Sequence, residues 1–244
     1  MCSDSLDIVD LHDVIMEAIH LGRVKFVSLL LSYGFPMKPS FGREAAVFKA
    51  KRVLEYFLGA RWDINEPVNV LIPPVLYYAA YAVTDVEMTS WFLEHSANLN
   101  TSCEVDYTPL SYAIRNARLS VIKLMLDYGG DVRKGQLLQY TVCRDEGLED
   151  IISLLVERGA PLNATIYQDS QTLMRFYLIS LGTALHTATE QGKTNAIRLL
   201  KHLGADTEVK DANGDTALEW AQKWNKAEMF VQIFIPILSP NHPR

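Results

Sequence analysis

A short motif returns several times along this chain of 244 residues. Thr-x-Leu triplets begin at Thr108, Thr183 and Thr216, and each opens a stretch with apolar residues at helical spacing. Gly-Gly or Gly-Ala pairs mark the ends of apolar stretches, at residues 129–130, 159–160 and 204–205. Self-similarity with a period of about 20 to 50 residues is the signature of repeat proteins. We therefore expect one elongated stack of similar units in place of a single central core.

The stretch from 106 to 132 shows what one unit contains. Leu110 and Ile114 have the spacing of one helix face, and Val121 and Met125 form a second such face. A threonine before the first helix can cap its start, and a glycine after the second can take the left-handed conformation that ends many helices. Because a pair of such short helices cannot bury its apolar face alone, neighbouring units have to stack.

These repeated residues resemble the ankyrin repeat, whose signature is Thr-Pro-Leu-His, two alanines, a glycine, and an apolar helix that closes on Gly-Ala-Asp. The resemblance is close over residues 182–214. The matching positions there are Thr183, Leu185, His186, Ala188, Gly192, Leu199, Leu200, Gly204, Ala205 and Asp206. The segments WDINEP, PPVLYYA and WFLEH are also similar to a fungal branch of the family.

The resemblance implies an all-α fold, an ankyrin-repeat α-solenoid of about seven helix-turn-helix units with short hairpin fingers. We expect a single domain over residues 1–244 with a flexible tail at 239–244. The expected units are 11–37, 43–65, 74–100, 106–132, 135–163, 182–210 and 211–238. Residues 164–181 fit neither neighbouring unit, and we interpret them as an 18-residue insertion. Their large apolar side chains predict that they pack on the solenoid.

Composition narrows the function classes. The net charge is −6, which argues against direct nucleic-acid binding through phosphate neutralisation. The three cysteines, Cys2, Cys103 and Cys143, do not form a disulfide framework, which favours a reducing compartment.

The first residues are acidic with no apolar segment behind them, and no stretch is long enough to cross a membrane, so we expect neither a signal peptide nor a membrane span. We expect a cytoplasmic or nuclear protein, or one found in both, that is monomeric.

Motifs for catalysis are absent from the sequence. It holds no phosphate-binding loop, no nucleophile elbow and no cysteine pair with metal-ligand spacing, so we expect no catalytic residue, cofactor or metal. His186 and Glu190 lie four residues apart and could form an acid–base pair, but the resemblance implies a structural hydrogen-bonding role for His186. Cys143 has no base nearby in sequence and is interpreted as an inert thiol.

Binding residues follow from the resemblance, because ankyrin proteins bind partners with the concave face of their first helices and with their fingertips. On the concave face the matching positions are His20, Tyr81, Arg115, Asn116, Glu190, Gln191, Lys223 and Trp224. At the fingertips they are Glu104, Tyr107, Asn213 and Asp215. The resulting hypothesis is a non-enzymatic scaffold or adaptor that binds another protein.

Two alternatives stay open at this point. The first is a transcriptional coregulator, for example of a fungal biosynthetic gene cluster, which would act through a bound transcription factor. The second is a small-molecule enzyme or binding protein that uses a pocket under the insertion at 164–181. The sequence leaves the partner and its pathway undetermined.

Overall fold

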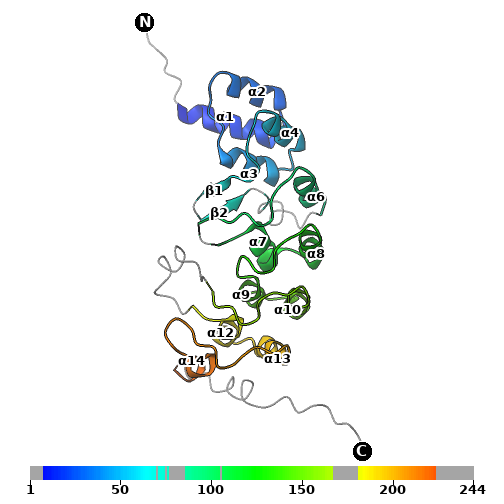
Figure 1. The fold of residues 1–244 in the computed structure, drawn as a ribbon. Helices are drawn as coiled ribbons and strands as arrows, with labels where there is room; N and C mark the ends of the chain where they lie inside the picture. Colours follow the sequence, from blue (N-terminus) through cyan, green and yellow to red (C-terminus); the bar gives the residue numbers. More distant parts are fainter. Residues whose placement is uncertain are drawn as a thin grey trace, which may run out of the picture.

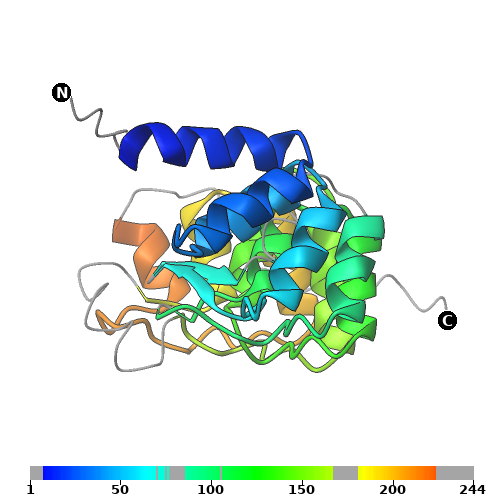
Figure 2. The same cartoon turned by 90° about the horizontal axis from the view of Figure 1, so that it is seen from above.

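The computed structural model describes residues 8–69, 71–74, 76, 86–104, 106–166 and 181–223. In these residues, pairs of short antiparallel helices follow one another along an elongated stack (Figure 1). The view along the stack shows the helices of successive units superimposed, with the connecting loops gathered on one side (Figure 2). The prediction of an all-α repeat solenoid is confirmed.

Most units contribute a first helix and a second helix, and the two kinds form two layers. The first helices are α1 (Ile8–His20), α3 (Pro39–Val47), α7 (Pro109–Asn116), α9 (Leu137–Val142), α12 (Ala184–Glu190) and α14 (Ala217–Lys223). The second helices are α2 (Val24–Ser32), α4 (Lys51–Gly59), α6 (Val86–Glu94), α8 (Leu119–Asp127), α10 (Leu148–Glu157) and α13 (Thr194–His202). The first helices α1, α3, α7, α9 and α12 each pack on the second helix of their own unit. Successive helices within one layer also pack on each other, as in the pairs α7–α9, α9–α12, α6–α8 and α10–α13.

Helix α3 begins earlier than the sequence suggested. It starts at Pro39, ahead of residue 43, where the unit was expected to begin. Proline suits the first turn of a helix because its fixed φ is already helical and its missing N–H would have no partner there. Lys38, the residue before it, is extended, as residues that precede proline prefer.

Local capping explains where several helices start. The Thr108 hydroxyl accepts a hydrogen bond from the Ser111 N–H at 3.1 Å, and the Thr108 N–H donates to the Ser111 hydroxyl at 3.1 Å. Thr216 and Glu219 form the same reciprocal box at the start of α14, with distances of 2.8 and 3.2 Å. Each box satisfies two backbone donors that the helix itself cannot satisfy.

The ends of the second helices follow an equally local rule. Gly129, which follows α8, has a φ of +94°, a conformation that a side chain would strain. The N–H of the next residue, Gly130, donates to the carbonyl oxygen of Met125 at 3.1 Å and so closes the helix end. The expected role of this glycine is confirmed.

The apolar core runs along the stack between the layers. Leu54, Ile122 and Leu200 are each fully buried, and they lie in different units. Ala113 and Ala188 are fully buried on first helices, where a small side chain lets neighbouring helices approach closely. The core is therefore continuous along the stack, as a repeat fold requires.

Hairpin fingers project on one side of the helices (Figure 1). Strands β1 (Pro67–Asn69) and β2 (Ile72–Pro74) pair antiparallel, with Pro67 opposite Pro74. A second finger closes through an isolated bridge between Lys210 and Thr216. These short hairpins are the fingers that the resemblance implied.

The predicted insertion and tail lie mostly outside the described residues. Of the insertion, only the first residues, 164–166, and the last, Leu181, are described. The Ile166 N–H donates to the Gly182 carbonyl oxygen at 3.0 Å, which brings the two ends of the segment together. No helix in the described parts of the chain is long and apolar enough to cross a membrane.

Candidate functional site

Three consecutive units bring charged and polar side chains to one surface, at the ends of their first helices. The Gln191 side-chain amide, after α12, lies 3.5 Å from the Cys143 thiol, after α9. Burial raises the pKa of the Cys143 thiol, and the charges of Arg115 and Lys193 oppose this shift while that of Glu190 adds to it. We call the residues Arg115, Cys143, Glu190 and Gln191 the first-helix surface. Arg115, Glu190 and Gln191 are exposed, and Cys143 is half-buried.

Two basic side chains hold these units together beneath the surface. The Arg144 guanidinium donates to the carbonyl oxygens of Ile114, at 2.6 Å, and Ala117, at 3.0 Å, at the end of α7. Burial lowers the pKa of this guanidinium. In the next unit, the Lys193 ammonium donates to the Arg144 carbonyl oxygen at 3.1 Å. Each basic group thus satisfies carbonyl oxygens in the preceding unit, where a helix end has no partners of its own.

Sequence reasoning missed Arg144 and Lys193 as organising residues. A signal was present, because a basic residue lies in the turn between the two helices of several units, as Arg118 and Lys193 show. The pattern could not tell which of these side chains reaches the preceding unit. Arg118, for example, is exposed, whereas Arg144 is half-buried.

The predicted fingertip residues lie on the finger side, and some are already engaged. Tyr107 packs edge-on against the ring of Tyr140, with 5.1 Å between the ring centres. Asp215 accepts a hydrogen bond from the Lys223 ammonium, and this raises the pKa of Lys223. Glu104 and Asn213 are exposed.

The other predicted first-helix residues differ in how available they are. The Asn116 amide is exposed and donates to the Tyr112 carbonyl oxygen of its own helix at 3.2 Å. His20 is half-buried, stacks on Phe48 with 3.9 Å between the ring centres, and lies 3.3 Å from a carboxylate oxygen of Glu44. It therefore joins α1 to α3 at the N-terminal end and lies apart from the first-helix surface. Tyr81 and Trp224 fall outside the described residues.

His186 has the structural role that the resemblance implied. Its Nδ1 accepts from the Thr183 N–H at 3.2 Å, so the ring proton belongs on Nε2. Nε2 then donates to the Asp215 carbonyl oxygen of the next finger at 3.0 Å. With both ring nitrogens engaged and the residue 5% exposed, His186 links a helix start to a finger and is not placed for acid–base chemistry. No group of three metal-ligating side chains occurs among the described residues.

Asparagine side chains add a second set of links between units, on the side of the helix ends. The Asn100 carbonyl oxygen accepts from the Asp131 N–H at 2.8 Å, and its amide donates to the Gly129 carbonyl oxygen at 3.0 Å. Asn65 and Asn163 reach the following unit in the same manner, through the N–H groups of Asn98 and Asp206. Because each link satisfies backbone groups of the next unit, it fixes the rotation of one unit relative to another.

Helix pairs stacked in two layers, with fingers on one side and polar links between units, define a helical repeat protein. The family model described as ankyrin repeats (3 copies) matches residues 43–136, 76–166 and 141–236. The chain belongs to the ankyrin-repeat family.

Relatives of known name match part of the chain. It is 28% identical over 130 residues to Ankyrin repeat and SOCS box protein 6 of Homo sapiens, across 51% of this chain and 30% of that protein. It is 24% identical over 139 residues to Ankyrin repeat protein nuc-2 of Neurospora crassa, across 56% of this chain and 12% of that protein. The chain therefore spans less than a third of the length of these relatives.

A solved structure shares the fold. It is that of the Bd0816 predatory endopeptidase from Bdellovibrio bacteriovorus in complex with immunity protein Bd3460. The match has a TM-score of 0.59 at 18% identity and covers 79% of this chain and 95% of that chain. At this identity the likeness concerns the fold alone.

Proposed function

We propose that this protein is a non-enzymatic scaffold that binds a partner protein through the first-helix surface and the neighbouring fingertips. The observation that carries the proposal is the convergence of Arg115, Cys143, Glu190 and Gln191 from three successive units on one surface. An extended surface of mixed charge suits a protein segment better than a phosphate backbone or a lipid.

In this proposal, the solenoid holds its binding side chains in a fixed arrangement before the partner binds. Arg144 and Lys193 fix neighbouring first helices through backbone carbonyl oxygens, so the exposed side chains above them are held in place before a partner arrives. A surface that is already rigid loses little conformational entropy on binding, which leaves more of the contact energy for affinity. Arg115 supplies a guanidinium, a group often found at the energetic centre of interfaces, and Glu190 supplies an opposite charge.

Affinity capture with matched variants tests the proposal. The bait is the purified full chain, compared with an Arg115→Ala/Glu190→Ala double variant on the first-helix surface. The matched control is Lys123→Ala/Glu149→Ala, which removes one charge of each sign from exposed positions on second helices. We expect the wild type and the control to capture the same protein and the double variant to lose it, with thermal unfolding unchanged in all three. Equal capture by the double variant would place binding elsewhere.

The same experiment separates the finer proposals. A captured transcription factor would assign the coregulator role, and any other captured protein would assign a general adaptor. A pocket under the insertion stays a prediction, because residues 167–180 lie outside the described part of the chain. A location in the cytoplasm or nucleus and a fungal origin stay predictions as well.

A further inference from the structure

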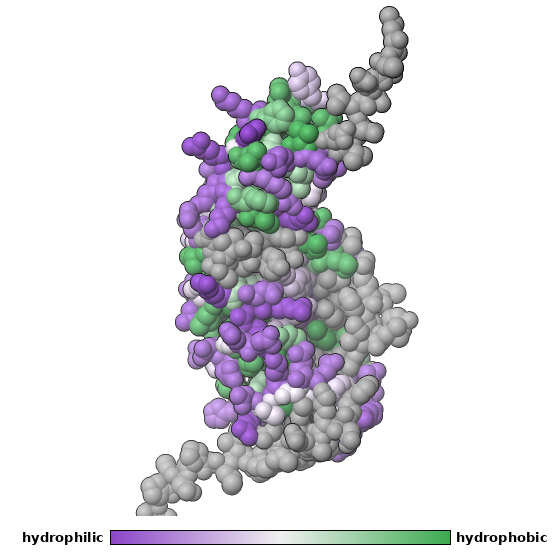
Figure 3. Space-filling model, turned by 180° about the vertical axis from the view of Figure 1, so that it is seen from behind, coloured by the Kyte–Doolittle hydropathy of each residue, from purple (hydrophilic) through white to green (hydrophobic). Residues whose placement is uncertain are grey.

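The N-terminal end of the stack presents an apolar face. Val14 of α1 is 39% exposed and Phe26 of α2 is 41% exposed, and Leu21 and Leu29 beside them are about half exposed. Apolar side chains gather at this end in the space-filling view (Figure 3). In a repeat protein, an outer face that no further unit covers normally carries polar side chains. This face instead has the composition of a buried surface.

Equivalent positions in later units show what kind of surface it is. Phe26 is the third residue of its nine-residue helix, and the third residues of α4, α8 and α13 are all fully buried, namely Val53, Val121 and Ala196. Val14 lies ten residues before the second helix, and the same position in later units holds the buried Phe41, Pro109 and Ala184. In those units the preceding helix pair provides the cover, as the packing of α1 on α3 and of α2 on α4 shows. The face of α1 and α2 is therefore a contact face between units, and no other described residue covers it.

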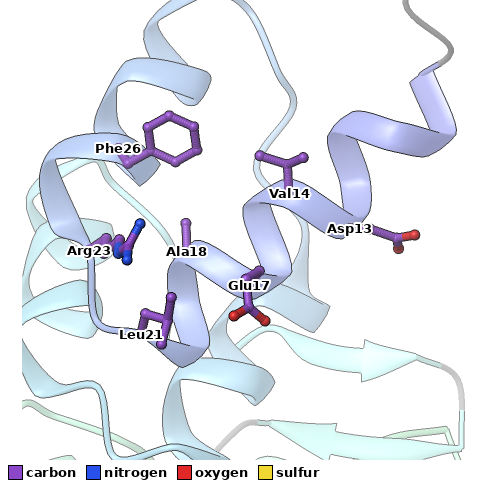
Figure 4. Close-up of a pocket in the computed structure, with 7 residues that line it drawn as sticks. All are labelled: Asp13, Val14, Glu17, Ala18, Leu21, Arg23 and Phe26. Atoms are coloured by element: carbon purple, nitrogen blue, oxygen red, sulfur yellow. The ribbon is translucent and has the colours of Figure 1, made fainter.

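The charges around this face are arranged so that the face complements itself. In Figure 4, Ala18 lies between Arg23 on one side and Glu17 on the other, and also between Phe26 and Leu21. These residues line a hollow of about 380 Å³. Arg23 is exposed and has no ion-pair partner among the described residues, and the Glu17 side chain is 67% exposed. A two-fold rotation about Ala18 exchanges Arg23 with Glu17 and Phe26 with Leu21.

We propose that a second copy of this chain covers the face of α1 and α2 in a two-fold dimer. In this arrangement Arg23 of each copy lies against Glu17 of the other, and Phe26 of each copy packs on Leu21 of the other. A closed two-fold contact uses the same patch on both copies, as self-complementary charges require. Two helices side by side offer a face of about 20 Å by 20 Å, which is small for a stable interface, so the dimer forms in the micromolar range. This state differs from the monomer that the sequence led us to expect.

Sedimentation velocity on the full chain tests the dimer, at concentrations from about 1 to about 100 μM that bracket a weak interface. We expect the wild type to pass from monomer to dimer in this range. The Phe26→Asp variant should stay monomeric, because two carboxylates would be buried without partners. Arg52→Glu, a charge reversal at an exposed position on α4, is the matched control and should dimerise like the wild type.

Charge reversal distinguishes the two-fold arrangement from any other. Arg23→Glu sets like charges opposite each other at both symmetric positions, and so does Glu17→Arg, so each variant alone should dimerise about tenfold more weakly. Mixed together, the two variants restore both attractive pairs and should form a heterodimer with near wild-type affinity. A wild type that stays monomeric throughout, an open-ended polymer, or a mixture no stronger than its components would each overturn the proposal.

Discussion

The Arg144 guanidinium donates to the carbonyl oxygen of Ile114 across 2.6 Å and so joins the turn of one unit to the first helix of the unit before it. The same group also donates to the carbonyl oxygen of Ala117, which follows that first helix, and to that of Glu146 in its own unit, both at 3.0 Å. Three carbonyl oxygens therefore depend on one half-buried cation. Such links hold the relative positions of the first helices, and with them the candidate binding surface.

Replacing Arg144 with Met should destabilise the stack. The methionine keeps much of the apolar stem but leaves the carbonyl oxygens of Ile114 and Ala117 without this donor, which costs about 1–3 kcal/mol in free energy of unfolding. Urea denaturation followed by circular dichroism measures the change. Arg118→Met, at an exposed position in the preceding turn, is the control and should stay within about 0.5 kcal/mol of the wild type. Equal effects of the two variants would show that the links of Arg144 add nothing.

Asn100→Ala should weaken the link between units at the helix ends. The substitution removes the partners of the Asp131 N–H and the Gly129 carbonyl oxygen, at an expected cost of about 1–2 kcal/mol. The midpoint of urea unfolding reports the loss. Asn195→Ala, exposed on α13, is the matched control, and a shift as large as that of Asn100→Ala would contradict the assigned role of Asn100.

Glu219 should make stability depend on pH. Hydrogen bonds from Thr216 hold the pKa of the Glu219 carboxyl below its ordinary value of 4.5. A carboxyl with a lowered folded pKa stabilises the fold above its unfolded pKa, and this contribution is lost as the pH falls through the folded value. The stability difference between the wild type and Glu219→Gln should therefore be full at pH 7, begin to shrink near pH 4.5, and vanish at lower pH. Urea unfolding of both proteins across this range measures it, and a difference that does not change with pH would refute the assignment.

Cys143 reports on the electrostatics of the first-helix surface. Because burial raises the pKa of its thiol, alkylation by iodoacetamide at pH 8 should be slower in the folded than in the urea-unfolded chain. A Cys2→Ser/Cys103→Ser background leaves Cys143 as the reactive thiol, and mass spectrometry follows the rate.

The charges of Arg115 and Glu190 shift the pKa of Cys143 in opposite directions, so removing each charge should change the alkylation rate in opposite directions. In the same background, Arg115→Ala removes a charge that lowers the pKa of Cys143 and should slow alkylation further. Glu190→Gln removes a charge that raises this pKa and should speed the reaction. Changes of the opposite sign would mean that Arg115 and Glu190 do not act on Cys143 from the same surface.

Much of the fold could be predicted from the sequence, because its signals are local. The Thr-x-Leu triplets predicted helix starts, and the reciprocal bonds of Thr108 and Thr216 show why. Gly129 predicted a helix end, and its φ of +94° gives the reason. Each of these features depends on a few neighbouring residues, so the sequence carries it in full.

The site was predictable only in part. The resemblance placed Arg115, Glu190 and Gln191 at binding positions, and the structure brings them close to Cys143. It also placed His20 there, yet that ring stacks on Phe48 at the N-terminal end of the described stack. The repeat pattern assigns the same role to every unit and does not distinguish an inner unit from a terminal one.

By itself, then, the sequence determined the helix pairs, their caps and the requirement that they stack. Only the tertiary structure decided which polar side chain reaches which carbonyl oxygen, as Arg144 does, and which apolar residues remain exposed. Val14 and Phe26 have the residue types of buried contact positions, and they are exposed because no described helix pair lies before them. Capping and helix formation depend on sequence neighbours, whereas burial depends on what another part of the chain, or another chain, places against the surface.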